Sequence, residues 1–415
     1  MSRPRSRRMR LAGATAALLF AGLSTVTACS SDSSDDSNDA TSAPTSTLPD
    51  NPATGDTVKL GFITVEGGAG VSLPESREAA EATIEYVNNN AGGLAGHKVE
   101  LVVCKQQEEP TSARNCANQM VEEKVSAVLV PGSGQGATIL PIIEGAGIPY
   151  VGVNGVSPAE LTSPGSFILS AGLPGFFLGT SEYAAKQGWK NVTFIVGDTG
   201  GQPAVIQALG APTFEAAGLN LNVVPLAIGI PDATPQLTAA LAGNPDVISV
   251  LGDESMCISV LKALQTTSPD TKSFLLSTCL GEGVIDAVGA DAVNGNVGVT
   301  TVDAFSDNPD SELYRSILAT YAPDLSPAGF AASAYQATLG VVRAANGIQG
   351  EVNAASIADA LRSSKNVELP AGGGISFSCD GSSFPMMPSI CTKQSLFGVI
   401  EDGVPSNLQL TGAPA

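Results

Sequence analysis

The chain has 415 residues, of which 43% are hydrophobic and 14% charged, and its 40 acidic residues outnumber its 20 basic ones. The formal net charge of −20 argues against nucleic acid as a partner, because phosphates require a basic protein face. The part of the chain that follows Val58 is longer than one hydrophobic core usually supports, so we expect two lobes.

Residues 1–28 are predicted to be an export signal. Arginines among the first ten residues precede a small, apolar stretch from Leu11 to Val26, which is too short for a permanent transmembrane helix. The stretch ends in the letters VTAC, and small residues directly before a cysteine resemble the bacterial lipobox. We therefore expect Cys29 to be acylated and to anchor the chain to the outer face of the cell membrane. The alternative is an ordinary secretory signal with a chance cysteine, and the choice between Sec and twin-arginine export stays open.

Residues 29–57 are predicted to form a disordered tether. They are rich in Ser, Asp, Thr and Pro and bury too little apolar surface to offset the entropy of ordering. Removal of the signal takes away five arginines, which leaves a net charge of about −25 on the mature chain. Such a charge suits a soluble, monomeric protein that works outside the cytoplasm.

Cysteine usage indicates disulfides. Six cysteines remain after Cys29, and an even number in an oxidising compartment favours a disulfide framework. Six cysteines allow fifteen connectivities, but the spacing suggests that neighbours pair, each bond adding about 2–4 kcal/mol. The predicted pairs are Cys104 with Cys116, Cys257 with Cys279, and Cys379 with Cys391. The competing interpretation is a metal site or a reactive thiol. The chain has no C-x-x-C pattern, and its one histidine, His97, lies in a turn-like segment. We therefore expect no metal and no cofactor.

Short apolar runs typical of strands alternate with runs typical of helices. The predicted strands are Val58–Val65, Val99–Val103, Ala127–Val130, Pro149–Val153, Phe167–Ser170, Val192–Val196, Leu221–Val224, Val247–Val250, Ser273–Leu276 and Val297–Val302. The predicted helices include Pro74–Asn90, Thr111–Lys124, Pro203–Ala217 and Ser255–Gln265. Strands rich in β-branched residues with helical crossovers indicate parallel sheets covered on both faces. The predicted fold class is α/β, with two doubly wound parallel-sheet lobes.

Several segments, in order, match a known family. They read VKLGFITVEGG from Val58, then YVNNNAGGLAGHKVELVV, then AGIPYVGVNGVSPAELT, then GWKNVTFIVGDTGGQ, and finally ISFSCDGSSF near the end. Together they resemble the type I periplasmic binding proteins of the branched-chain amino-acid, amide and urea class. Each motif is loose alone, but their order and spacing along the chain are specific together.

The resemblance implies two lobes joined by a three-stranded hinge that close on a ligand. It places lobe 1 at residues 58–170 and 301–371, and lobe 2 at residues 171–300 and 372–412. It further implies a substrate-binding lipoprotein of an ABC importer that captures a small organic solute and hands it to permease and ATPase subunits. In such a protein we expect no catalytic residue.

The first ligand loop implied by the resemblance runs from Pro131 to Ala137 and offers Ser133, Gly134 and Gln135. In the family this loop holds an acidic ligand group, and ligands of open α/β sheets sit at the carboxyl ends of strands. The alternative is a plain turn between a strand and a helix. The loop lacks the G-x-G-x-x-G and Lys-Ser/Thr patterns of nucleotide sites, and its glycines have the wrong offsets for a G-x-S-x-G nucleophile.

The other implied ligand residues lie in later loops. Gly155 and Ser157 match the family's contacts in the second loop, where Val156 replaces the usual Ser or Thr. Gly200 stands where amino-acid binders often place a stacking Tyr, which predicts a wider cleft. One of three lobe 2 acids is expected to hold a ligand ammonium, and the candidates are Asp253, Glu254 and Glu282. An amino acid, an amide, or an aromatic, alicyclic or steroid-type carboxylate are the candidate solutes.

Two other functional classes are compatible with export. An exported hydrolase would need a nucleophile and base, and with His97 alone no Ser-His-Asp set is plausible unless His97 lies in the cleft. A glycosidase would use paired carboxylates, but the aromatics that usually line such clefts are sparse here. A ligand-sensing receptor subunit of the same fold is the closer alternative. Adjacent permease and ATPase genes would support import, whereas an adjacent kinase gene would support sensing.

Overall fold

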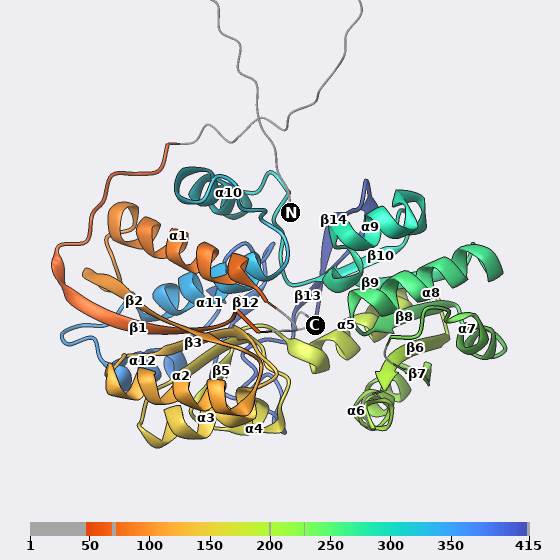
Figure 1. Ribbon diagram of the computed structural model, residues 1–415, viewed down its shortest axis with the longest axis horizontal. Helices are drawn as coiled ribbons and strands as arrows, with labels where there is room; N and C mark the ends of the chain where they lie inside the picture. Colours follow the sequence, from red (N-terminus) through yellow and green to blue (C-terminus); the bar gives the residue numbers. More distant parts are fainter. Residues whose placement is uncertain (1–46, 69–71, 199–200, 228, 413–415) are drawn as a thin grey trace, which may run out of the picture. The chain divides into compact units, whose positions relative to one another are not determined.

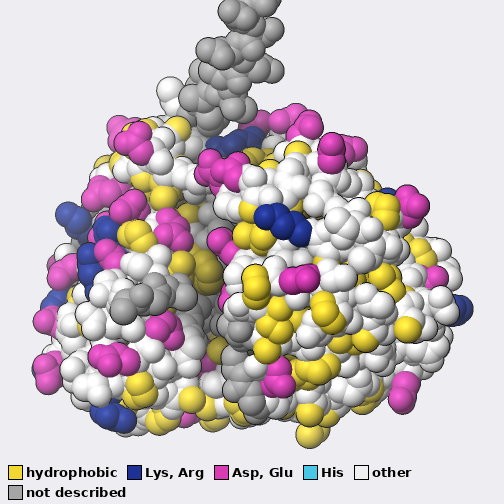
Figure 2. Space-filling model, turned by 45° about the vertical axis from the view of Figure 1, so that its right-hand side comes forward, with side chains coloured by type: hydrophobic (Ala, Val, Ile, Leu, Met, Phe, Trp, Pro, Cys, Tyr) yellow, Lys and Arg dark blue, Asp and Glu magenta, His cyan; other side chains and the backbone are white. Residues whose placement is uncertain are grey.

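The computed structural model describes residues 47–68, 72–198, 201–227 and 229–412. The predicted export signal, Cys29 and most of the predicted tether lie outside these residues. Within the described ranges, no helix combines the length and the apolar character needed to cross a bilayer. Acidic side chains are spread over the face shown in Figure 2 and outnumber the basic ones there.

The first sheet has five parallel strands in the order β2-β1-β3-β4-β5. Its strands are β1 (Gly55–Val65), β2 (His97–Gln106), β3 (Val128–Gly132), β4 (Tyr150–Asn154) and β5 (Ser166–Ile168). The helices between them are α1 (Pro74–Asn90), α2 (Pro110–Glu122), α3 (Gly136–Gly145) and α4 (Pro158–Thr162). Pro74 and Pro110 open α1 and α2, where a missing N–H costs no helical hydrogen bond. Because the strands are parallel, all their carboxyl ends meet at one edge.

Both faces of the first sheet are covered, as Figure 1 shows for α1 above it and α2 and α3 below. Leu60 and Phe62 pack in the core on one face, against α1, α10 (Pro309–Tyr321) and α11 (Phe330–Ala345). Ile63 points to the other face, where it packs with α2 and α3. This alternation is what a strand buried on both sides requires.

The second sheet has seven strands in the order β14-β13-β10-β9-β8-β6-β7. Its elements are α5 (Gly172–Gln187), β6 (Asn191–Asp198), α6 (Gln202–Ala216), β7 (Asn220–Ala227), α7 (Thr234–Leu241), β8 (Val247–Leu251), α8 (Glu254–Thr267), β9 (Lys272–Leu276), η1 (Ser277–Cys279), α9 (Glu282–Val288), η2 (Ala290–Ala292), β10 (Val297–Thr300), β13 (Ser395–Glu401) and β14 (Val404–Thr411). Phe194 packs with α5 and α6 on one face, and Ile195 packs with α7, α8 and α9 on the other. Trp189 lies against Tyr183 and Phe274.

Three segments connect the two lobes, which gives the expected two-lobed α/β fold. The first follows β5, the second follows β10, and the third precedes β13. The first and third lie side by side, because Ile168 forms a parallel bridge with Ile390 and accepts a hydrogen bond from Cys391 N at 2.9 Å. The second is fixed to lobe 1 by the hydrogen bond from Asp303 N to Ala371 O, at 2.7 Å.

The division of the tail differs from the sequence expectation, which placed residues 372–412 with lobe 2. Strand β12 (Ser376–Phe377) pairs with β11 (Val367–Glu368), near α12 (Ala354–Ser363) and the other lobe 1 helices. Phe377, Cys379 and Cys391 are buried in the core of lobe 1. We therefore propose that the boundary falls near Thr392, and that only β13 and β14 complete lobe 2 from the tail.

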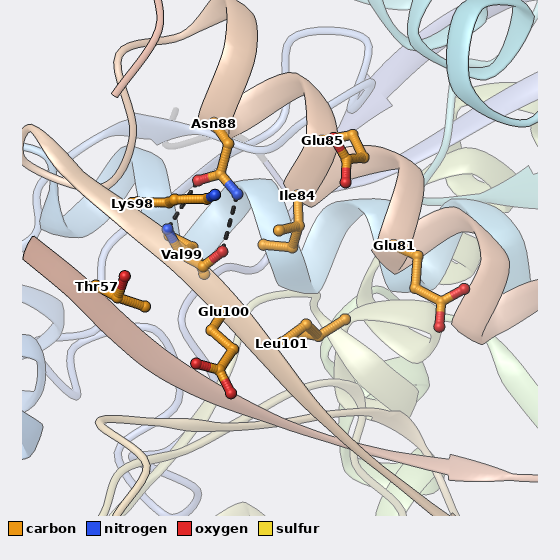
Figure 3. Close-up of a pocket in the computed structure, with 9 residues that line it drawn as sticks. All are labelled: Thr57, Glu81, Ile84, Glu85, Asn88, Lys98, Val99, Glu100 and Leu101. Carbon is orange, nitrogen blue, oxygen red and sulfur yellow. Dashed lines mark hydrogen bonds between the residues drawn. The ribbon is translucent and has the colours of Figure 1, made fainter. Parts of the chain in front are cut away.

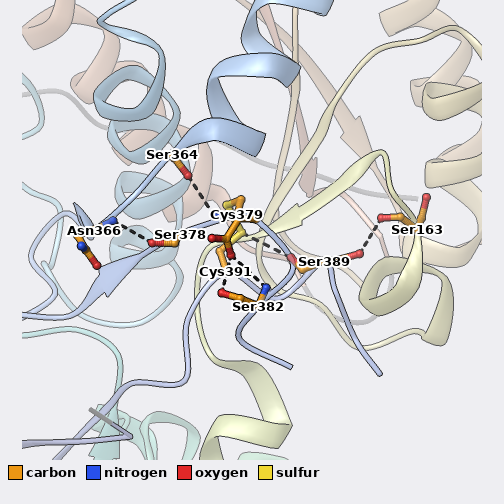
Figure 4. The surroundings of a disulfide bond; sticks show 9 residues. Ser163, Ser364, Asn366, Ser378, Cys379, Ser382, Ser389 and Cys391 are labelled. Carbon is orange, nitrogen blue, oxygen red and sulfur yellow. Dashed lines mark hydrogen bonds between the residues drawn. A yellow bond between two sulfur atoms is a disulfide. The ribbon is translucent and has the colours of Figure 1, made fainter. Parts of the chain in front are cut away.

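The three predicted disulfides are present: Cys104–Cys116, Cys257–Cys279 and Cys379–Cys391. The last one staples the segment that lies beside β5. Figure 4 shows its surroundings, in which Ser364 Oγ accepts from Cys379 N at 3.1 Å and Ser389 Oγ donates to Ser163 O at 2.7 Å. These bonds fix the third connecting segment to lobe 1.

Candidate functional site

Two of the predicted ligand loops lie side by side at the carboxyl edge of the first sheet. The loop of Ser133 follows β3 and the loop of Ser157 follows β4, and these strands are neighbours in the sheet. Asn154, the last residue of β4, ties the two loops together: its Nδ2 donates to Pro131 O at 3.2 Å. The topology thus brings together six of the predicted ligand residues: Ser133, Gly134, Gln135, Gly155, Val156 and Ser157.

The first loop is organised around a carboxylate of the chain itself. Ser133 Oγ donates to Glu108 Oε1 at 2.9 Å, and the Gly134 N–H donates to the same oxygen at 3.3 Å. Gln106, a fully buried residue at the end of β2, donates from Nε2 to Glu108 Oε1 at 2.8 Å and to Ser133 Oγ at 3.1 Å. Ser133 Oγ also accepts from the Gln135 N–H at 2.9 Å. An acidic side chain thus occupies the donors that the family resemblance assigns to a ligand.

The second loop is organised around Glu160, which is only 1% exposed. Its carboxylate accepts hydrogen bonds from the N–H groups of Val156 and Ser157, at 3.2 and 2.9 Å, and from Ser157 Oγ at 2.8 Å. Ser157 in turn caps α4, which completes a capping box. A Cβ on Gly136 would lie 2.1 Å from the Glu160 carboxyl carbon, so only glycine fits there.

Tyr150 completes the support of the second loop from inside lobe 1. Its hydroxyl donates to Glu160 Oε1 at 2.7 Å. Burial and the neighbouring Glu160 carboxylate raise the pKa of Tyr150 well above its usual value, so the hydroxyl stays a neutral donor. The second loop is therefore held in a preformed conformation by hydrogen bonds to Glu160, which Tyr150 supports from inside lobe 1.

Apolar surface lies beside these polar groups. Val156 is 66% exposed, although a buried position would suit its side chain better. Phe330 begins α11, and its ring lies 3.0 Å from where a Cβ of Gly132 would be, at the end of β3. The absence of a side chain at Gly132 lets this ring approach the first loop. The edge therefore offers an apolar wall next to hydrogen-bonding groups, which is the usual make-up of a small-molecule site.

The predicted residues of lobe 2 lie at the corresponding edge of the second sheet. Asp253 follows β8 and caps α8, because its carboxylate accepts from Met256 N at 2.9 Å and from Ser255 Oγ at 2.8 Å. Glu254 and Glu282, in the first turns of α8 and α9, are exposed. The Glu254 carboxylate lies over Gly281, 3.0 Å from where a Cβ would be. Gly200 lies outside the described residues.

Glu66 forms a charged cluster at the end of β1. Its carboxylate accepts from Arg77 Nε at 3.0 Å and from Lys105 Nζ at 2.6 Å. Partial burial alone would raise the pKa of Glu66, but the hydrogen bonds from Arg77 and Lys105 outweigh it and hold the pKa below its usual value. Arg77 and Lys105 are therefore already paired with an acidic side chain.

His97 does not lie at the predicted ligand loops. His97 begins β2, and its Nδ1 lies 3.0 Å from Asp56 O, at the opposite end of the strand from the ligand loops. Across the described residues, no group of three His, Cys, Asp or Glu side chains is arranged to hold a metal ion.

One surface hollow among the described residues lies away from the ligand loops. It is a groove of about 340 Å³ between α1 and the outer strand β2, lined by Glu81, Ile84, Asn88 and Leu101 among others (Figure 3). Asn88 is satisfied within the chain, since its side chain exchanges hydrogen bonds of 2.8 and 2.7 Å with the Val99 backbone. None of the predicted ligand residues lines this groove.

Sequence reasoning missed three residues of the edge. Glu160 had a readable signal, because Ser157 and Glu160 have the S-x-x-E spacing of a capping box. Glu108 and Phe330 had none, since strand pairing and helix packing bring them to the loop from distant parts of the chain.

One family of known proteins matches most of the chain. It is described as periplasmic binding protein, and the match covers residues 57–389. No curated protein matches the sequence significantly.

Solved structures share the fold at low identity. The branched-chain amino acid transporter substrate binding protein of Streptococcus pneumoniae, in complex with isoleucine, is 20% identical with a TM-score of 0.68, covering 86% of this chain and 100% of that chain. An ABC transporter substrate-binding protein from Sphaerobacter thermophilus is 20% identical with a TM-score of 0.70, covering 86% and 97%. A fatty acid ABC transporter substrate-binding protein from Thermomonospora curvata is 16% identical with a TM-score of 0.69, covering 88% and 93%.

Proposed function

Because this chain belongs to the periplasmic binding protein family, we propose that it is the substrate-binding subunit of an ABC importer. It captures a small organic solute between its two lobes and delivers the solute to the permease, which an ATPase subunit drives. It acts as a monomer and has no catalytic role. The fold neighbours that carry transport names support this proposal.

The observation that carries the proposal is the carboxyl edge of the first sheet. There the loops after β3 and β4 offer small residues and hydroxyls beside the apolar side chains of Val156 and Phe330. The loops after β8 and β9 occupy the same edge of the second sheet, so both lobes present loops suited to a ligand. Closure of two such lobes about a hinge is a known way to enclose a ligand.

We propose a solute with an apolar body, drawn from amino acids, amides and organic carboxylates. The exposed Val156 and the ring of Phe330 support an apolar body. The neighbour in complex with isoleucine and the neighbour named for fatty acids support such a solute. A thermal-shift screen across amino acids, amides, urea and organic acids tests this proposal. Stabilisation by a bulky or alicyclic solute is expected, and stabilisation by leucine or valine alone would contradict the wider cleft.

We also propose that the protein is a lipoprotein on the outer face of the cell membrane. The VTAC sequence at Cys29 and the Ser- and Asp-rich stretch after it support this. Labelling of growing cells with radioactive palmitate should tag the wild-type protein, and Cys29→Ser should abolish the label and release the protein from the membrane fraction. A membrane-bound, labelled Cys29→Ser variant would contradict lipidation at this residue.

A further inference from the structure

Glu108 changes what the first ligand loop can accept. Two donors of this loop, Ser133 Oγ and the Gly134 N–H, are both engaged by Glu108 Oε1, at 2.9 and 3.3 Å. A carboxylate of the solute would have to displace this side chain or lie against it. Two carboxylates at contact distance repel each other, so the loop as built is unsuited to an anion.

The chain holds Glu108 in place through its backbone as well as its side chain. The Glu108 N–H donates to Gln106 Oε1 at 2.6 Å, while Gln106 Nε2 donates to the carboxylate at 2.8 Å. Gln106 is fully buried, so this clamp belongs to the core of lobe 1. Glu108 has a φ of 55°, in the left-handed region that ordinary residues rarely adopt. The strained backbone of Glu108 and its two hydrogen bonds with Gln106 indicate that the Glu108 carboxylate has a fixed position.

The charge of Glu108 has no partner in the described part of the chain. The ion pairs there involve Glu66, Glu78, Glu81, Glu123, Asp310 and Asp359, and none involves Glu108. Its second oxygen, Oε2, accepts no hydrogen bond from the described residues and lies 3.0 Å from where a Cβ of Gly134 would be. A carboxylate with an open oxygen and no counter-charge is suited to a ligand cation or N–H donor.

We propose that Glu108 takes the place of a ligand carboxylate in the loop after β3, and that the solute presents an ammonium, amidinium or amide N–H group to it. This inference rests on the proposed solute-binding function and narrows it. The exposed Glu254 and Glu282 at the edge of the second sheet fit the same preference, because neither has an ion-pair partner among the described residues. Glu108 is then a specificity-determining residue, and it excludes solutes whose only polar group is a carboxylate.

The test compares solutes that share a hydrocarbon group but differ in the polar group attached to it. The full-length protein is titrated by calorimetry with cyclohexylamine, cyclohexanecarboxamide and cyclohexanecarboxylate, and with 3-methylbutylamine, 4-methylpentanamide and 4-methylpentanoate. We expect the amines and amides to bind at least tenfold more tightly than the matching carboxylates. Glu108→Gln should weaken amine binding at least tenfold. Glu109→Gln is the matched control, because Glu109 is the exposed neighbour without a capping hydrogen bond, and it should change affinity less than twofold.

If no probe binds, native mass spectrometry of the same preparation tests the inference by detecting any co-purified solute. A co-purified solute with an ammonium, amidine or amide group supports the inference. Tighter binding of the carboxylates, with a gain in affinity in Glu108→Gln, would overturn the inference about Glu108 but leave the proposed function standing. An anionic co-purified solute would have the same consequence. Absence of any bound probe and of any co-purified solute would overturn both.

Discussion

The carboxyl edges of the two sheets are built differently. At the edge of the first sheet, Glu108 and Glu160 turn inward and each accepts hydrogen bonds from the loop that follows a strand. At the edge of the second sheet, Glu254 and Glu282 are exposed, and the carboxylate of Asp253 is used to cap its own helix. Lobe 1 therefore presents a preformed surface, whereas the acids of lobe 2 acquire partners only from a ligand or from solvent. A preformed surface lowers the entropy lost on binding, so we expect the solute to bind lobe 1 before lobe 2 closes on it.

The largest effect is expected at the centre of the preformed edge. Glu160→Ala removes the acceptor of the buried Tyr150 hydroxyl and of the Ser157 loop. Each buried donor left unpaired costs about 1–3 kcal/mol, so the free energy of unfolding should fall by about 3–4 kcal/mol. Urea denaturation measures this change.

The matched control for Glu160 is an acid of the other edge. Glu254 also lies in the first turn of a helix but is exposed, so Glu254→Ala should change the stability by less than about 0.5 kcal/mol. Equal losses in the two variants would contradict the difference between the edges.

The next effect concerns the disulfides of the two lobes. Cys379–Cys391 and Cys257–Cys279 close loops with sequence separations of 12 and 22 residues. Replacement of either pair by serines should lower stability by about 2–3 kcal/mol. Only the Cys379–Cys391 variant should also speed hydrogen exchange at Ile168, because this bond staples the segment beside β5. Faster hydrogen exchange at Ile168 in both variants would show that the effect of Cys379–Cys391 is not confined to the segment beside β5.

A smaller effect is expected on solute affinity. Ser133→Ala removes the hydroxyl that donates to Glu108 and should loosen the carboxylate, which lowers affinity about tenfold, or about 1.4 kcal/mol. Ser255→Ala removes an exposed hydroxyl that donates a hydrogen bond to Asp253 and should leave affinity within about twofold. Calorimetric titration of both variants with the same solute measures these affinities. Equal losses of affinity in the two variants would argue against a special role of the first loop.

The smallest effect is a dependence of stability on pH. The pKa of Glu66 in the folded chain is held below its unfolded value, so the folded state binds fewer protons there. The stabilisation is complete well above the ordinary glutamate pKa of 4.5 and is lost as the pH falls through the lower pKa of the folded state. Between about pH 6 and pH 3 the wild type should therefore lose more stability than Glu66→Gln, by less than about 1 kcal/mol. Parallel acid profiles of the two proteins would show that the cluster contributes nothing.

Local patterns predicted much of the fold. All ten predicted strands exist, and the predicted helix Pro74–Asn90 has the bounds of α1. Strands such as β1 are apolar on both faces, and a proline opens α1. The neighbouring residues alone were therefore enough to predict these two elements. The short β12 and the segment around Cys379 pack with lobe 1 instead of lobe 2. Their place could not be predicted, because two residues carry no periodicity and their packing depends on distant contacts.

The candidate site was predicted less completely. The loops of Ser133 and Ser157 follow strands, and that position alone predicts a shared edge. The partners of those loops depend on register: β2 must pair with β1 for Gln106 to present Glu108 to the loop after β3. No local pattern encodes such a contact between separate strands, which is why the inward carboxylate could not be foreseen.

We propose that this chain captures one small solute through the preformed edge of lobe 1. Native mass spectrometry of the full-length protein, after incubation with a mixed library of amines, amides, amino acids and organic acids, tests it most directly. We expect one solute molecule bound per chain. This solute carries an N–H-donating group, and its binding is lost in Glu108→Gln but not in Glu109→Gln. A spectrum that shows only the unbound chain, with every library member, would contradict it.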